Sequence, residues 1–160
     1  MSELRLRRAA RVVLVDDDDE RILLVRFDFP GQRPVWATVG GGLEPGETHE
    51  DAARRELLEE AGLEVAELGP PVWTRTHVFD MSIRWDGQTE VYFFLRTRSF
   101  EPRPTHTWQQ LNAEGVTAIR WWTLAELEAA DVLFAPRRLP ALVRELLLHG
   151  PPAEPVDVGI

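Results

Sequence analysis

Residues 41–63 read GGLEPGETHEDAARRELLEEAGL and carry the strongest structural signal in this chain. An α-helix turns by about 100° per residue, so Glu56, Glu59 and Glu60 share one helical face. Like charges at this spacing repel by roughly a few tenths of a kcal/mol per pair, which gives a helix in plain solvent no advantage. A bound divalent cation reverses that energy, because Mg²⁺ and Mn²⁺ prefer hard oxygen ligands. The spacing therefore indicates a metal site.

The residues around these acids predict a helix with defined ends. Thr48 is followed three positions later by Asp51, as in a capping box, and Gly62 stands where a helix-terminating glycine belongs. Leu57 lies away from the acidic face and indicates a buried side. We therefore expect a helix over residues 48–61. The alternative is an acidic face that binds nothing and is only solvated, as is usual for acidic clusters on helices.

The same residues resemble the Nudix box, G-x5-E-x7-R-E-U-x-E-E-x-G-U, in which U is a bulky aliphatic residue. Every fixed position is filled, by Gly41, Glu47, Arg55, Glu56, Leu57, Glu59, Glu60, Gly62 and Leu63. The chain is thus similar to the Nudix hydrolases. This resemblance implies an α/β/α sandwich with a mixed β-sheet. One departure is Val39, which stands where the family often has proline, and we expect it to alter loop stiffness and not chemistry.

The resemblance also implies an activity and a set of site residues. The activity is Mg²⁺-dependent (or Mn²⁺-dependent) cleavage of the pyrophosphate linkage in a nucleoside diphosphate linked to a further group, X. The implied metal ligands are the side chains of Glu56, Glu59 and Glu60 and the carbonyl of Gly40. We expect Glu56, Glu59 and Arg55 to act in catalysis. Glu47 is expected to orient Arg55 across the loop.

Substrate contacts are expected around the glycine-rich loop. Gly41 and Gly42 let the backbone approach a ligand and leave N–H groups free. Trp36 lies shortly before this loop and is a candidate for stacking on a base, as is Trp108. Arg26, Arg75 and Arg84 are candidate phosphate or base contacts.

Acids outside residues 41–63 compete for a further role as ligand or base. Glu90, Glu101 and Glu114 are the candidates, and we prefer Glu114, then Glu101, because loop acids have the freedom to swing onto a metal. The acidic run at residues 16–20 is interpreted as an exposed hairpin turn, because consecutive turn residues rarely converge on one ion.

Length and composition bound the remaining possibilities. With 160 residues the chain is expected to form one domain over 1–150, followed by a disordered tail over 151–160. The net charge of −9 argues against binding duplex nucleic acid and leaves a small nucleotide or other diphosphate as the expected partner. No long apolar run or signal-like segment is present, so we expect a cytoplasmic protein without membrane contact. The absence of cysteine excludes disulfides and thiolate metal sites and leaves the redox compartment open. A homodimer is left open.

Hydrophobic patterning predicts an α+β fold with helices packed on the faces of a sheet. Strands are expected at 10–15, 21–27, 35–39, 63–68, 72–79 and 116–122, and a hairpin joins 82–85 to 89–97 through Asp86-Gly87. A short helix is expected from Thr123 and a longer one over 137–149. Residues 101–115 are expected to form a long functional loop.

A second candidate function belongs to a different class. The chain could be a non-catalytic nucleotide-binding or regulatory Nudix-like domain, but such domains usually lose the box carboxylates, which are intact here. An acidic interaction module without a metal is a weaker alternative. Phe79 stands where ADP-ribose hydrolases of the family tend to carry proline. The tyrosine that dinucleoside polyphosphate hydrolases tend to carry at 79–81 is also absent. Nucleoside triphosphates, nucleotide sugars and other diphosphates therefore remain as substrates.

Overall fold

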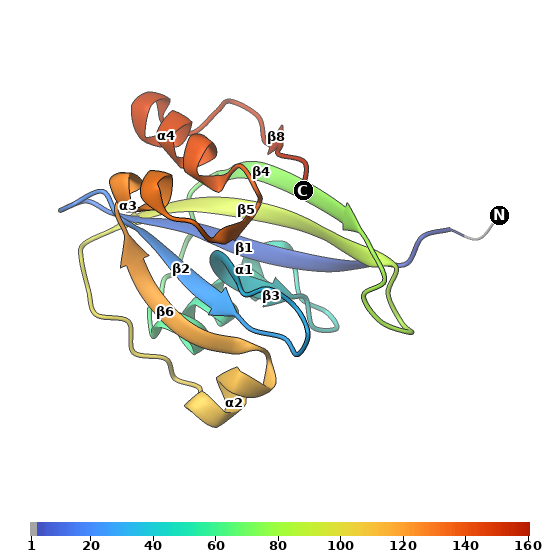
Figure 1. Ribbon diagram of the computed structural model, residues 1–160. Helices are drawn as coiled ribbons and strands as arrows, with labels where there is room; N and C mark the ends of the chain where they lie inside the picture. The colour runs from blue at the N-terminus through green and yellow to red at the C-terminus, as the bar shows by residue number, and fades with distance from the viewer. Residues whose placement is uncertain (1–2) are drawn as a thin grey trace.

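The computed structural model describes residues 3–160, which form a mixed β-sheet with helices on both faces (Figure 1). The strands are β1 (Leu6–Asp16), β2 (Ile22–Phe27), β3 (Val35–Gly42), β4 (Pro71–Val78), β5 (Gly87–Thr97), β6 (Val116–Trp122), β7 (Leu133–Ala135) and β8 (Val156–Asp157). The helices are α1 (His49–Ala61), α2 (Trp108–Ala113), α3 (Leu124–Ala129) and α4 (Leu139–His149). This arrangement confirms the predicted α+β class.

The sheet has the strand order β6-β2-β3-β1-β5-β4-β8, and β7 pairs with β3. Its central pair is parallel: β1 lies beside β5 along its whole length, from Leu6 opposite Gly87 to Asp16 opposite Thr97. β3 runs antiparallel to both β1 and β2. This pairing brings the glycine-rich end of β3 against the middle of β1.

Two apolar cores lie on the two faces of the sheet. Val12 and Leu14 of β1 pack in the core that contains α1, whereas Val13 and Val15 pack in the core that contains α3 and α4. Side chains alternate along a strand, so a strand covered on both faces reads as a continuous apolar run. α1 and the α3–α4 pair therefore cover opposite faces, as Figure 1 shows. None of the helices in residues 3–160 has the length and apolar character needed to cross a membrane.

The predicted hairpin at Asp86-Gly87 is wrong. β4 pairs directly with β5, with Val78 opposite Gly87, and residues 79–86 form the connection. Asp86 instead accepts a hydrogen bond from the backbone N–H of Arg5 at 2.8 Å. No strand forms over residues 63–68 either.

Residues 151–160 and 101–115 also differ from expectation. β8 pairs with β4, and Val158 is buried between the strands and α4 and donates its N–H to the Thr74 carbonyl at 2.9 Å. The tail is therefore ordered where it supplies an apolar side chain to the core. The expected loop contains α2, whose capping box of Thr107 and Gln110 is the same local signal that identifies α1 and α3.

Candidate active site

The first feature of the site is the orientation of α1. The Thr48 side chain accepts a hydrogen bond from the Asp51 backbone at 3.1 Å, and the Asp51 side chain accepts one from the Thr48 backbone at 3.1 Å. At the other end, Gly62 adopts a left-handed conformation with φ of 75°. Leu57 is fully buried against the sheet. The predicted helix is confirmed within one residue, and its packing turns Glu56 and Glu60 toward the end of β3.

Glu56 and Glu60 both contact the glycines of β3. The Gly40 N–H donates to Glu60 Oε1 at 2.9 Å. A Cβ at Gly41 would lie 2.5 Å from Glu56 Oε1, so only glycine leaves room for this carboxylate. Glu56 is 7% exposed and Glu60 is 1% exposed. These side chains therefore lie in a buried junction between helix and strand, and not on a solvated helix face.

Arg55 binds Glu47 of the preceding loop and two acids of its own helix, Glu56 and Glu59. Its Nε and Nη2 donate to the two carboxylate oxygens of Glu47 at 2.8 and 2.9 Å, a bidentate pair that is strong and directional. Its Nη1 donates to Glu56 Oε1 at 3.0 Å and to Glu59 Oε2 at 3.3 Å. The hydrogen bonds to Glu47 raise the pKa of Arg55 and lower the pKa of Glu47. Arg55 thus has the position of a group that orients two of the acids.

The electrostatics of the buried acids are unfavourable without a further cation. Burial, together with the charge of Glu56, raises the pKa of Glu60 well above its ordinary value. Burial also raises the pKa of Glu56, although the adjacent Arg55 opposes this shift. Two anionic side chains in one buried junction repel each other unless a proton or a cation compensates them.

The donor atoms of these residues are of the chemical type that binds a divalent cation. Across residues 3–160, no group of three or more acidic or histidine side chains stands in metal-ligating positions. The reason is that Glu56 and Glu59 face Arg55, while Glu60 accepts the Gly40 amide. The donors are nevertheless hard carboxylate oxygens, two of them buried and mutually repulsive, which is the donor set that Mg²⁺ or Mn²⁺ takes.

A second buried charge cluster lies beside the glycines. Glu90 Oε2 accepts from Arg11 Nε at 2.6 Å, and Glu90 Oε1 accepts from Arg75 Nη1 at 2.6 Å. Burial alone would raise the pKa of Glu90, but the charges of Arg11 and Arg75 together hold it below its ordinary value. Arg11 Nη1 also donates to the carbonyl of Gly40 at 3.2 Å. Since a carbonyl has two lone pairs, one remains for another partner.

This cluster changes the interpretation of two candidates. Glu90 is not a free acid and Arg75 is not a free phosphate contact, because they bind each other. Arg11 did not emerge from the sequence as a site residue. The signal that could have identified it is its position as the only charged residue in the apolar run 9–15.

The two preferred extra acids lie in different surroundings. Glu114 ends α2 and is exposed, and its charge contributes to the raised pKa of Glu56, which places it near the site. Glu101 is exposed on the segment that follows β5. Glu114 therefore stays the preferred candidate.

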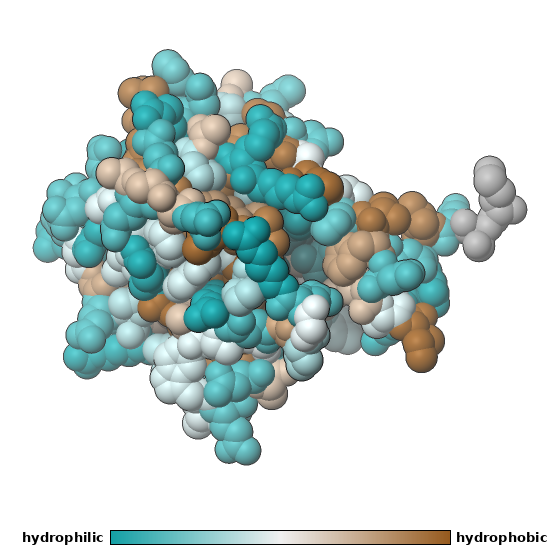
Figure 2. All heavy atoms as spheres, in the orientation of Figure 1, coloured by the Kyte–Doolittle hydropathy of each residue, from teal (hydrophilic) through white to brown (hydrophobic). Residues whose placement is uncertain are grey.

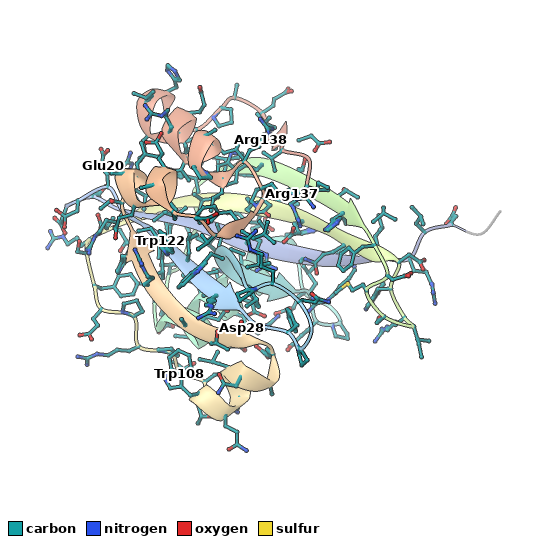
Figure 3. The ribbon with its side chains drawn as sticks, viewed as in Figure 1. Glu20, Asp28, Trp108, Trp122, Arg137 and Arg138 are labelled. Carbon is teal, nitrogen blue, oxygen red and sulfur yellow. The ribbon has the colours of Figure 1, made fainter. Side chains whose placement is uncertain are left out.

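The candidate substrate contacts of β2 and β3 lie on the α3–α4 face. Trp36 packs edge-on against Trp122 with ring centroids 5.1 Å apart, and its cross-strand neighbour is Arg26. Arg26 pairs with Asp28 at 3.2 Å. Figure 3 shows Trp122 at the opposite end of β6 from Trp108, which begins α2. Trp36 and Arg26 thus lie across the sheet from the acidic face of α1.

The face that carries these residues is visible in the space-filling view. Figure 2 shows that it is largely hydrophilic and hollowed to the right of its centre. Arg84, the remaining arginine candidate, lies over its neighbour Trp85, in the connection between β4 and β5. The structure therefore brings the candidates of α1 together with Gly40 and Gly41 of β3, whereas Trp36 and Arg26 lie on the other face of the sheet.

Comparisons with known proteins identify the family of this chain. The family model of the NUDIX domain matches residues 5–143. Nucleoside triphosphatase NudI of Enterobacter sp. (strain 638) is 44% identical over 69 residues, which are 42% of this chain and 45% of that protein. NudI of Escherichia fergusonii is 37% identical over 86 residues, or 51% and 59% of the two chains. The chain spans about half the length of the curated relatives it matches.

Solved structures share the fold. The NUDIX domain of Shewanella oneidensis NrtR, solved with ADP ribose, superposes with a TM-score of 0.67 at 19% identity, covering 91% of this chain and 90% of that one. A MutT protein from Methanosarcina mazei Go1 gives a TM-score of 0.67 at 14% identity, covering 91% and 97%. At these identities the likeness concerns the fold alone.

Proposed function

Because this chain belongs to the NUDIX family, we propose that it is a hydrolase of phosphoric anhydrides that cleaves the pyrophosphate linkage of a nucleoside diphosphate linked to a further group. Nucleoside triphosphates are the first substrates to consider, since they have this linkage and the matched relatives are named nucleoside triphosphatases. The observation that carries the proposal is the buried junction of Glu56 and Glu60 with Gly40 and Gly41.

A divalent cation, Mg²⁺ or Mn²⁺, is assigned to this junction. The residues that would hold it are Glu56, Glu59, Glu60 and the carbonyl of Gly40, with Glu114 as the further acid. When bound, such a cation neutralises charge on phosphoryl oxygens and lowers the pKa of bound water. It would also compensate the repulsion between the two buried carboxylates.

The protein's own groups then have distinct roles in hydrolysis. The oxygen of water forms a bond to phosphorus, the bond from phosphorus to the leaving phosphate breaks, and the water proton passes to a carboxylate, which we assign to Glu56 or Glu59. Arg55 holds both carboxylates in place, and Glu47 in turn holds Arg55. Most of the rate enhancement comes from such positioning and from charge neutralisation.

Turnover of a substrate panel tests the proposal. Nucleoside triphosphates, nucleotide sugars and other diphosphates are incubated with Mg²⁺, with Mn²⁺ or with a chelator, and released products are quantified. We expect metal-dependent hydrolysis, and we expect Glu59→Gln and Glu60→Gln each to lower kcat on the order of 100-fold or more. Glu50→Gln is the matched control, because Glu50 is exposed in the first turn of the same helix.

Two results would overturn the proposal. The first is full activity in both Gln variants at the junction. The second is an absence of product from every compound although a nucleotide stabilises the folded protein, which would favour the non-catalytic nucleotide-binding alternative. Two further expectations stay predictions: a cytoplasmic location and no binding of duplex nucleic acid. Whether the protein forms a homodimer stays open.

A further inference from the structure

The arginines around the candidate site differ in whether an acid already neutralises them. Arg55 is bound to Glu47, and Arg11 and Arg75 share Glu90. Arg7 is different: in the described part of the chain, residues 3–160, its guanidinium forms no ion pair with any carboxylate. Its one side-chain hydrogen bond runs from Nη1 to the neutral Gln88 Oε1 at 3.0 Å.

Arg7 is nevertheless held in a defined place. Gln88 is its direct partner in the parallel pairing of β1 with β5, and Gln88 is itself buried. The guanidinium lies against Gly42, where a Cβ would overlap its Nε and Nη2 atoms. Gly42 therefore has to be glycine for Arg7 to occupy this position.

This position is next to the acidic junction. The residue before Gly42 is Gly41, which makes room for the carboxylate of Glu56 in the same way. Consecutive Cα atoms are about 3.8 Å apart, and side chains alternate along a strand. Consecutive glycines of β3 thus accommodate a carboxylate of α1 on one side and a guanidinium of β1 on the other.

The charge on Arg7 is poorly compensated. Burial and the charge of Arg11 lower its pKa, and the negative charges of Glu56, Glu90 and Glu114 offset this only in part. A guanidinium stays protonated in proteins, so the half-buried cation carries a desolvation cost that no acid in contact repays. Its planar donors match two oxygens of a phosphate group.

We propose that Arg7 binds the phosphate chain of the substrate beside the acidic junction. The inference rests on the proposed function, because the ligand is the diphosphate or triphosphate that we propose is hydrolysed at the junction of Glu56 and Glu60. It adds a residue outside the box to the substrate site. It also accounts for Gly42, which is needed to leave room for the guanidinium.

Binding of nonhydrolysable nucleotides separates this proposal from the question of turnover. Titration calorimetry compares the native protein with Arg7→Gln and Arg7→Lys, with Mg²⁺ and with chelator. The ligands are nucleoside triphosphate analogues in which imido groups replace both the α,β and the β,γ bridging oxygens. Arg98→Gln is the control, because Arg98 is exposed and follows the end of β5 that pairs with Asp16, at the other end of β1 from Arg7. Thermal unfolding without ligand monitors the fold of each variant.

We expect Arg7→Gln to weaken binding of the triphosphate analogue on the order of 10- to 100-fold, the loss of a charge-assisted pair. Arg7→Lys should recover part of that affinity as a point charge, and Arg98→Gln should change nothing. The loss should also shrink from triphosphate to monophosphate and vanish for the nucleoside, a dependence that a merely structural residue would not show.

Several outcomes overturn the inference. They are no binding of the analogues to the native protein, equal affinity in Arg7→Gln, or an affinity loss that is the same for the nucleoside and the triphosphate. A native protein that binds the analogue through Arg7 and hydrolyses no compound of the panel would support the inference and refute the proposed function, so the two failures are distinguishable.

Discussion

Replacing Glu90 with glutamine should cost about 3–5 kcal/mol of unfolding free energy, the penalty for breaking a buried ion pair from one side. Each carboxylate oxygen of Glu90 accepts one short hydrogen bond, from Arg11 and from Arg75, both at 2.6 Å. Glutamine keeps one acceptor and turns an N–H₂ donor toward the other guanidinium. The side chains of Arg11 and Arg75 are 10% exposed and that of Glu90 is 2% exposed, so water screens the lost pair weakly.

Urea unfolding followed by tryptophan fluorescence measures this cost, because Trp73 packs on Tyr92 close to the cluster, with ring centroids 5.5 Å apart. Glu101→Gln is the control, as Glu101 is exposed, and it should shift the unfolding free energy by under about 0.5 kcal/mol. A loss below about 1 kcal/mol in Glu90→Gln would refute the assignment of a tightly coupled buried cluster.

The pH dependence of the same variant follows from the sign of the shift. The pKa of Glu90 is lower in the folded protein than its ordinary value of 4.5, so the unfolded state binds the proton more readily. The stabilisation is therefore complete above the ordinary value and is lost as pH falls through the folded pKa. The difference between the native protein and Glu90→Gln should shrink over that acidic range. A difference that grows on acidification would contradict the sign.

Three further predictions concern the junction and the C-terminal segment. Gly41→Ala should abolish hydrolysis and weaken binding of Mn²⁺, measured by calorimetry, because its Cβ would displace the Glu56 carboxylate; unchanged Mn²⁺ affinity would contradict the contact. Glu60→Gln should raise the melting temperature of the metal-free protein by roughly a few degrees at pH 8, since a buried carboxyl with a raised pKa loses stability as pH rises through that pKa. Scanning calorimetry with a chelator checks this, and a lower melting temperature would show that the repulsion is not there. Val158→Ala should cost about 1–3 kcal/mol in urea unfolding, since Val158 is 1% exposed in the core; a loss within error would mean the segment is not docked in solution.

The features that the sequence predicted well are those specified by neighbouring residues. The N-terminal ends of α1 and α3 are determined by capping boxes within four residues, Thr48 with Asp51 and Thr123 with Glu126. Both capping boxes form as expected. The acids of α1 share a face for the same reason, because helical geometry alone determines it.

The predictions that failed concern residues whose partners lie far along the chain. Asp86 looks like a hairpin residue from its neighbour Gly87, but it binds Arg5, 81 residues away. Arg11 and Glu90 are 79 residues apart, and only the parallel pairing of β1 with β5 brings them together. The burial of Arg11 could be read from its place in the apolar run 9–15, but no local pattern identifies the distant acid that pairs with it.

The backbone of Gly40 links the local and the distant parts of the site. Its N–H donates to Glu60 of α1, which the box specifies, and its carbonyl accepts from Arg11, which is held by Glu90 of β5. The helix therefore defines which acids are present, whereas the sheet defines where the end of β3 lies relative to them. Because both clusters bind the backbone of one residue, Gly40, a substitution in either should move the other. The metal chemistry expected of the box thus depends on a charge cluster that lies wholly outside it.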